Sequence, residues 1–128
     1  MNENEIGQII VDTAVDIHKN LGPGLFESVY EIILASELEN KGLKIKRQVD
    51  FPVEYKGIKF ETGFRADMVI NDLVIIEIKS VETINNSHKK QVLTYLKLSG
   101  KKLGFLINFG ACLMKDGIKR IINGQLEP

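Results

Sequence analysis

The stretch LVIIEIKS, residues 73 to 80, decides the fold that we expect for this chain. Isoleucine and valine favour a pleated strand, and this run is the most apolar of the strand-like segments, so a central strand is predicted here. Alternate residues of a strand share a face, so Glu77 and Lys79 point to one side while Ile76 and Ile78 point to the other. The strand is too apolar for a comfortable edge, where an exposed ion pair would contribute little. A carboxylate and an ammonium on one face of this strand therefore indicate a function.

The elements around this strand follow from hydrophobic periodicity and from turn residues. Helices are expected at residues 5–21, 25–41 and 86–99, strands at 44–55, 58–70, 73–79 and 102–109, and a last strand or short helix at 116–123, with turns at Gly22-Pro23-Gly24, Lys56-Gly57 and Asn71-Asp72. The order α-α-β-β-β-α-β, followed by a short last element, predicts one α/β domain over residues 1–128, with a mixed β-sheet flanked by helices.

The composition is that of an ordinary globular protein with one core, since hydrophobic residues make up 44% and charged residues 27% of the 128 residues. No apolar run reaches the length of about 18 residues that a membrane helix needs. The acidic and polar start MNENEIGQ does not resemble a signal peptide. Cys112 is the only cysteine, which excludes an internal disulfide and a cysteine-based zinc site. We therefore expect a cytoplasmic protein.

The charge balance limits the ways in which the chain can bind nucleic acid. The net charge is zero, with 17 basic and 17 acidic residues. This balance argues against a protein that is held on nucleic acid by bulk charge. A local basic surface remains compatible with it, so an enzyme that acts on nucleic acid is not excluded.

A second carboxylate, Asp67, lies in the strand that precedes the central one. Cross-strand partners in a hairpin share a face. A two-residue loop would put Asp67 and Glu77 on opposite faces, whereas a three-residue loop would gather Asp67, Glu77 and Lys79 in one patch. Two carboxylates that close repel each other unless a cation lies between them, and oxygen ligands suit a hard divalent ion such as Mg²⁺. The Lys79 ammonium beside them would orient a water or stabilise charge on a phosphate.

The pattern of Asp67 followed by Glu77-Ile78-Lys79 on neighbouring strands resembles the motif of the PD-(D/E)XK nuclease superfamily. Two further motifs and the order of the segments point the same way. GLFESVY, residues 24 to 30, resembles the signature of the small bacterial GxxExxY proteins of that superfamily, and QVLTY, residues 91 to 95, resembles the QxxxY motif of its RecB-like branch. The proline that often precedes the aspartate is absent, as it commonly is in the superfamily. The resemblance covers roughly residues 5 to 123.

The resemblance implies a restriction-endonuclease-like core and a metal-dependent nuclease that hydrolyses phosphodiester bonds of nucleic acid, with DNA as the expected substrate. It implies that Asp67, Glu77 and the backbone carbonyl of Ile78 bind Mg²⁺ or Mn²⁺ and that Lys79 positions the attacking water. Glu27 would complete the catalytic site by a direct or water-mediated metal contact. The residues expected to support the site or to contact substrate are Gln91 and Tyr95, which lie four apart on one helical face, together with Tyr30 and Arg65.

Several residues also have a purely structural interpretation. A glutamate in the first turn of a helix, such as Glu27, is favoured by the helix dipole and by capping alone. Tyr30 lies one turn later and is interpreted as a packing residue with a hydroxyl partner rather than as a catalyst. His18 and His88 are expected at the surface or in caps and not as metal ligands. Cys112 is expected to be a small core residue.

The competing hypothesis is a catalytically silent nuclease-fold module that binds nucleic acid or a protein partner. Neutral overall charge favours this hypothesis, and the presence of all three of Asp67, Glu77 and Lys79 opposes it. A homodimer, and a subunit of a toxin-antitoxin or repair complex whose partner supplies the affinity for DNA, are both compatible with the sequence.

Overall fold

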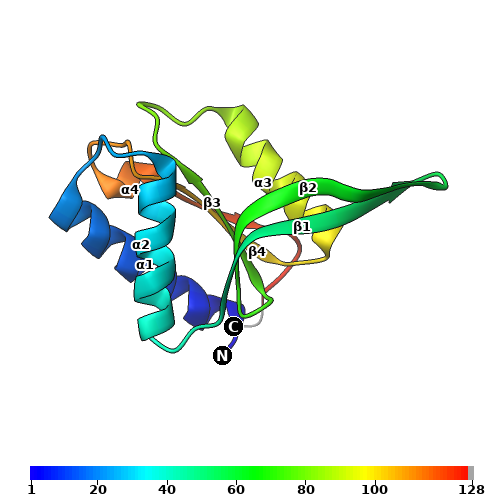
Figure 1. Cartoon of the computed structure of the whole chain (residues 1–128), viewed down its shortest axis with the longest axis horizontal. Helices are drawn as coiled ribbons and strands as arrows, with labels where there is room; N and C mark the ends of the chain where they lie inside the picture. The colour runs from blue at the N-terminus through cyan, green and yellow to red at the C-terminus, as the bar shows by residue number, and fades with distance from the viewer. Residues whose placement is uncertain (127–128) are drawn as a thin grey trace.

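The computed structural model describes residues 1–126 and contains helices and strands close to the expected positions (Figure 1). The helices are α1 (Glu3–Leu21), α2 (Glu27–Asn40), α3 (Asn86–Ser99) and α4 (Met114–Gly117), and the strands are β1 (Ile45–Tyr55), β2 (Ile58–Ile70), β3 (Val74–Lys79), β4 (Leu103–Asn108) and β5 (Ile118–Ile122). α1 starts early because Asn2 and Glu5 form a capping box in front of it. The expected last element is divided between α4 and β5.

Within residues 1–126 the strands form one five-stranded sheet in the order β1-β2-β3-β4-β5. β3 and β4 run parallel, and the other neighbouring strands run antiparallel. A parallel pair needs a crossover connection, which α3 supplies between β3 and β4. The sheet is therefore mixed, and the strand LVIIEIK lies at its centre as predicted.

Apolar side chains fill both faces of the sheet. The larger cluster lies between the sheet and the layer of α1 and α2, and it contains Ile76 and Ile78 of β3. The smaller cluster lies between the sheet and α3, and it contains Ile75 of β3 and Val92 of α3. Glu77 alternates with Ile76 and Ile78 and so faces α3, where it is only 5% exposed. The two faces predicted for this strand are confirmed.

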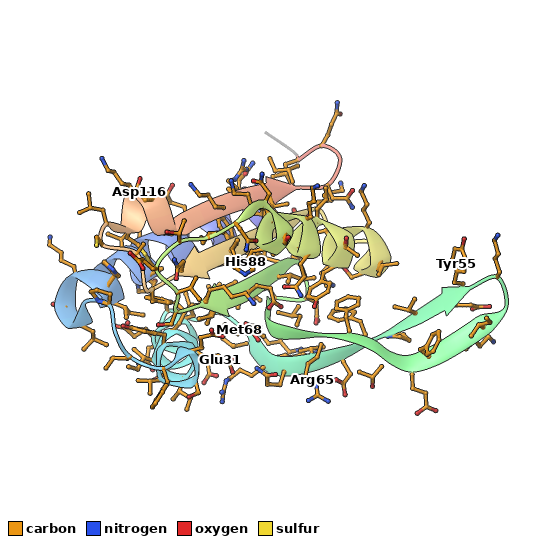
Figure 2. The ribbon with its side chains drawn as sticks, turned by 90° about the horizontal axis from the view of Figure 1, so that it is seen from above. Glu31, Tyr55, Arg65, Met68, His88 and Asp116 are labelled. Carbon is orange, nitrogen blue, oxygen red and sulfur yellow. The ribbon has the colours of Figure 1, made fainter. Side chains whose placement is uncertain are left out.

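β1 and β2 extend beyond the rest of the sheet as a hairpin, with Tyr55 at its far end (Figures 1 and 2). β2 pairs with β3 only from Met68 to Ile70, whereas its pairing with β1 continues to the hairpin turn. Near the tip, Tyr55 and Phe60 are 65% and 54% exposed. The sheet therefore splits next to Met68, and from that residue towards the tip β2 and β3 are no longer paired.

Close to this split, the alternation of side chains between the two faces of the sheet is interrupted in both strands of the hairpin. In β1, Ile45 packs against the α1–α2 cluster, but Val49, four residues later, packs against the α3 cluster. In β2, Met68 belongs to the first cluster and Ala66 to the second. Residues at even spacings share a face in a regular strand. The regular alternation is thus interrupted at residues 48 and 67, which lie between these positions.

Candidate active site

Asp67 and Glu77 lie side by side at the split between β2 and β3. The two strands are joined by the three residues 71–73, so of the two loop lengths that the sequence left open, the structure has the one that places Asp67 and Glu77 on the same face. The Asp67 N–H donates to Glu77 Oε1 at 3.0 Å, and the Ile78 N–H donates to Asp67 Oδ2 at 2.8 Å. Side-chain bonds to the backbone thus take the place of the strand ladder where the strands separate, and they hold both carboxylates at this position.

Burial and repulsion alter the protonation of the pair. The pKa of Glu77 rises to about 8, first because burial disfavours its charged form and then because Asp67 places a negative charge nearby, while the charge of Lys79 opposes the rise. The pKa of the Tyr95 hydroxyl is also raised, by burial first and then by the charges of Glu77 and Asp67. Tyr95 of α3 therefore lies within electrostatic reach of both carboxylates.

The donor set of the pair fits a divalent cation. Carboxylate oxygens are ligands that Mg²⁺ prefers, and a cation between Asp67 and Glu77 offsets their repulsion. Within residues 1–126, no group of three or more His, Cys, Asp and Glu side chains is placed to hold a metal ion. Asp67 and Glu77 offer fewer ligands than a divalent cation takes, so a cation bound by the pair would have further ligands beside these two carboxylates.

Lys79 ends β3, two residues after Glu77 on the same strand face. Among the described residues, no hydrogen bond or ion pair engages its ammonium group. The chain that follows is fixed by Asn108, which pairs with Lys79 across the parallel strands. Asn108 Oδ1 accepts from the Val81 N–H at 3.0 Å, and Asn108 Nδ2 donates to the Val81 carbonyl at 2.8 Å. Sequence reasoning missed Asn108, since a lone asparagine in an apolar strand belongs to no motif.

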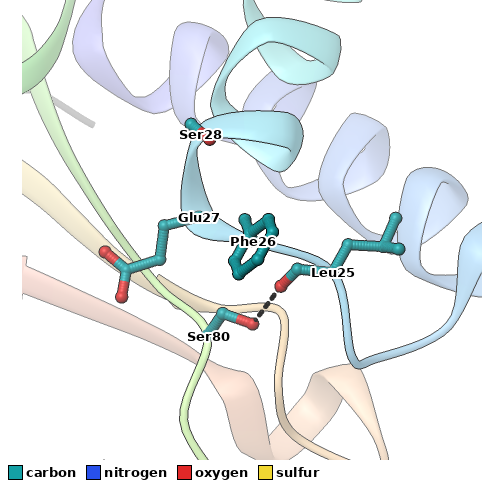
Figure 3. A pocket seen from close by; sticks show the side chains of 5 residues that line it. All are labelled: Leu25, Phe26, Glu27, Ser28 and Ser80. Atoms are coloured by element: carbon teal, nitrogen blue, oxygen red, sulfur yellow. Dashed lines mark hydrogen bonds between the residues drawn. The ribbon is translucent and has the colours of Figure 1, made fainter.

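Glu27 approaches the end of β3 from the first turn of α2. The Ser80 hydroxyl, next to Lys79 in the chain, donates to the Leu25 carbonyl at 2.7 Å and so joins the start of α2 to the end of β3 (Figure 3). A pocket of about 380 Å³ opens here, lined by Leu25, Phe26, Glu27, Ser28 and Ser80. Figure 3 shows the Glu27 and Leu25 side chains leaving the chain in opposite directions. The Glu27 carboxylate is exposed in this pocket, and no hydrogen bond within residues 1–126 joins it to Asp67 or Glu77.

Tyr30 fixes the loop that precedes Glu27. Its hydroxyl donates to the Gly22 carbonyl at 2.6 Å and accepts from the Leu25 N–H at 3.2 Å. Its buried ring stacks on Phe109, with ring centroids 4.4 Å apart. Tyr30 is thus a packing residue with hydroxyl partners, and it supports the position of Glu27 from one helical turn away.

The other expected site residues differ in their distance from the pair. Tyr95 stacks on Phe64 of β2, with ring centroids 4.2 Å apart. Gln91 lies one turn before Tyr95 on α3 and is exposed. Arg65 is not brought to the carboxylates, because its Nε donates to Asp50 Oδ1 at 2.6 Å on the exposed side of the hairpin.

Glu31 is a buried carboxylate that was not predicted as a site residue, and Gln48 links it to Asp67. Glu31 Oε2 accepts from Arg47 Nε and Nη2 at 2.9 and 2.6 Å, and Glu31 Oε1 accepts from Gln48 Nε2 at 2.8 Å. The same Gln48 nitrogen lies 3.4 Å from Asp67 Oδ1. Glu31 follows Glu27 by four residues, so it shares a face of α2 with it, and this spacing was a usable signal. Arg47 and Gln48 belong to no recognisable pattern.

The histidines and the cysteine take structural positions. His88 caps α3 together with Asn85, as expected. The expected surface position of His18 is wrong, because His18 is buried with its Nε2 at 2.7 Å from the Ala111 carbonyl. The expected core position of Cys112 is also wrong, because Cys112 is exposed in the loop before α4 and its neighbour Ala111 is buried instead.

Comparison with known proteins identifies the family. A family model described as the PD-(D/E)XK nuclease superfamily matches residues 4–121. Comparisons with curated proteins and with solved structures give no match. Among residues 1–126, no helix is long and apolar enough to span a membrane. The mixed sheet with flanking helices has the restriction-endonuclease-like architecture of the matched superfamily. The matched segment and the fold together establish that the chain belongs to the PD-(D/E)XK nuclease superfamily.

Proposed function

We propose that this chain is a nuclease that hydrolyses the phosphodiester bonds of DNA with Mg²⁺ or Mn²⁺ as its cofactor. Members of the superfamily are typically nucleases that act on nucleic acid and use divalent metal ions. The observation that carries the proposal is the Asp67–Glu77 pair, in which Glu77 is buried and Asp67 half-buried, with Lys79 following on the same strand as Glu77. Two repelling carboxylates of this kind are costly in a protein that does not use them.

The cation would be held by the carboxylates of Asp67 and Glu77, with the Ile78 carbonyl as a further ligand and Glu27 in direct or water-mediated contact. These groups fit because all of them offer oxygen ligands and the two central ones repel each other without a cation. A bound Mg²⁺ or Mn²⁺ lowers the pKa of its water and takes up negative charge on the phosphate.

Lys79 is proposed to position the attacking water. An ammonium group has three donors and no acceptor, so it donates to one lone pair of the water oxygen. The second lone pair of that oxygen stays available for attack on the phosphate. The same charge stabilises the negative phosphate. This role is supported by the lack of a competing partner for Lys79 among the described residues.

We further propose that the chain belongs to the GxxExxY group and carries the QxxxY motif of the RecB-like branch. The hydrogen bonds of the Tyr30 hydroxyl support this assignment, because they hold the loop in front of Glu27 and so account for a tyrosine three residues after the glutamate in the motif. On α3, Tyr95 lies within electrostatic reach of the carboxylate pair and Gln91 lies one turn away, so both are proposed to support the site or contact substrate. Arg65, exposed on the hairpin, is proposed as a more distant substrate contact.

A cleavage assay tests the proposal. Plasmid DNA, DNA oligonucleotides and RNA oligonucleotides are incubated with the protein in Mg²⁺, Mn²⁺ or EDTA. We expect DNA cleavage with either metal, none in EDTA, and a rate lower by a factor on the order of 10²–10³ for Lys79→Ala. Lys115→Ala, which changes an exposed lysine of α4, is the matched control and should cleave normally. Binding of nucleic acid or of a protein without any cleavage would favour the silent module instead.

A further inference from the structure

We propose that Gln48, anchored on Glu31, is a positioning residue that holds the Asp67 carboxylate in the orientation the site requires. The inference rests on the proposed function, because it assigns a task to residues behind the same carboxylate pair. It concerns how the pair is held and not which bond is cleaved.

The backbone of Gln48 is unusual for its place in the fold. Its φ is +51°, in the left-handed region that favours glycine, asparagine and aspartate. The other non-glycine residues with positive φ among residues 1–126 are Lys56, Asn71 and Asp72, and these lie in turns between strands. Gln48 alone among them lies inside a strand. A conformation of this kind persists where the surroundings maintain it, and such positions are common at functional sites.

The left-handed conformation opens the sheet opposite Asp67. The register of β1 and β2 is continuous from Ile45 to Phe51 except at Gln48 and Asp67, which face each other without pairing. The Gln48 side chain instead reaches two carboxylates, with Nε2 at 2.8 Å from Glu31 Oε1 and at 3.4 Å from Asp67 Oδ1. An amide nitrogen has two N–H donors, so one group serves both acceptors.

Glu31 makes this arrangement rigid. It is buried, and the Arg47 guanidinium binds its other oxygen at 2.6 and 2.9 Å. The Gln48 amide must turn its nitrogen, and not its oxygen, towards two neighbouring carboxylates, because its oxygen would repel them. The fixed Glu31 therefore determines the direction of the hydrogen that points at Asp67.

Both oxygens of Asp67 are consequently held. Oδ2 accepts from the Ile78 N–H at 2.8 Å, and Oδ1 receives the longer contact from Gln48 at 3.4 Å. Two donors on opposite oxygens fix the rotation of the carboxylate plane and leave the remaining lone pairs free for a cation. Groups that orient a ligand in this way typically change metal affinity or activity by about 10- to 100-fold when they are removed.

The substitution Gln48→Gly tests the positioning role without straining the backbone. Glycine accepts the left-handed backbone without strain and removes the amide. Lys56→Gly is the matched control, since Lys56 has a φ of +47° in the hairpin turn and lies away from the pair. We expect Lys56→Gly to melt at or above the wild-type temperature, whereas Gln48→Gly should melt lower, because buried Glu31 Oε1 loses its donor. Only Gln48→Gly should alter the Ile78 amide resonance in the metal-free protein, and only it should weaken Mn²⁺ binding measured by calorimetry, by about tenfold.

An unchanged Ile78 resonance in Gln48→Gly, or an equal loss of Mn²⁺ affinity in Lys56→Gly, would overturn the inference. If Gln48→Gly does not fold, Gln48→Asn tolerates the left-handed backbone with a shorter amide and should move the Ile78 resonance in a metal-free sample. The Ile78 readout needs neither metal nor substrate. A wild-type protein that neither binds Mn²⁺ nor cleaves DNA, yet shows the Gln48-dependent shift, contradicts the proposed function and keeps the positioning role.

Discussion

At the scale of single residues, the dominant feature is a carboxylate buried beside another carboxylate. Glu77 accepts one backbone N–H, but burial and the charge of Asp67 outweigh this bond. The metal-free fold therefore favours protonated Glu77. A cation reverses this preference, so the same two side chains destabilise the free protein and bind the ion.

The first prediction concerns pH. Because the folded pKa of Glu77 is raised from 4.5 to about 8, the folded protein binds this proton more tightly than the unfolded chain does. The resulting stability is fully present below about pH 4.5 and is lost as the pH rises through about 8. A tenfold difference in proton affinity between the folded and unfolded chains corresponds to roughly 1.4 kcal/mol. Urea unfolding in EDTA should therefore show the wild type weakened by a few kcal/mol between pH 5 and pH 8.5, relative to Glu77→Gln.

Glu82→Gln, which changes an exposed glutamate beyond β3, provides the control for this measurement. It should follow the wild type at both pH values. Equal pH dependence in the wild type and Glu77→Gln would mean that Glu77 ionises normally in the folded protein.

The second prediction concerns the individual contributions to cleavage. Asp67→Ala, Glu77→Ala and Lys79→Ala should each reduce the rate by a factor on the order of 10²–10³, because each removes a group at the proposed metal or water position. Gln91→Ala should cost less, because Gln91 is exposed one turn away from Tyr95. Single-turnover rates, measured beside thermal melting in EDTA, check that a loss of cleavage is not a loss of the fold.

At the scale of elements, the start of α2 is held by contacts with two other parts of the chain. The Ser80 hydroxyl binds Leu25, and Tyr30 binds both Gly22 and Leu25 while it stacks on Phe109. The position of Glu27 is therefore set by the loop in front of the helix and by the segment after β3, and not by α2 alone.

The third prediction tests this attachment. Tyr30→Phe keeps the stacked ring but leaves the Gly22 carbonyl and the Leu25 N–H without their hydroxyl partner. Unsatisfied groups of this kind cost about 1–3 kcal/mol each, so the free energy of unfolding should fall by that order. Urea denaturation measures the change, with Tyr55→Phe at the exposed hairpin tip as the control. A stable Tyr30→Phe would show that the loop has other sufficient contacts.

The sequence predicted the elements well and the details of the site only in part. The central strand and the turn at Asn71-Asp72 follow from alternation and turn residues, which are local properties. Asp67 lies beside Glu77 because the loop has three residues, one of the two lengths that the sequence left open. The change of face at Gln48 does not follow from periodicity, because it depends on a left-handed residue that no turn motif marks. The link from Gln48 to Glu31 joins two distant segments and becomes visible only in three dimensions.

At the scale of the whole molecule, the chain divides into a packed body and a projecting hairpin. The body has clusters on both faces of the sheet, whereas the end of the hairpin carries exposed Tyr55, Ile58 and Phe60. Phe64 marks the boundary, since it stacks between Phe51 and Tyr95. The part beyond Phe64 contributes little burial to the fold.

The fourth prediction follows from this division. The triple variant Tyr55→Thr, Ile58→Thr and Phe60→Thr keeps strand-forming residues, so its free energy of unfolding should stay within about 0.5 kcal/mol of the wild type. Phe64→Ala should lose about 3–5 kcal/mol, because it empties a buried position. Equilibrium unfolding in urea compares the two. A large loss in the triple variant would place the hairpin tip inside the cooperative fold.

The split in the sheet also leaves backbone donors of β2 and β3 without a strand partner. Unpaired backbone donors on a strand edge are a template for strand addition and self-association. Here the Asp67 carboxylate accepts a hydrogen bond from the Ile78 N–H, and the Glu77 carboxylate accepts one from the Asp67 N–H. The carboxylates thus keep this edge closed to foreign strands. We expect Asp67→Ala to scatter more light than Lys79→Ala at high concentration while both remain folded, so that solubility as well as chemistry depends on this aspartate.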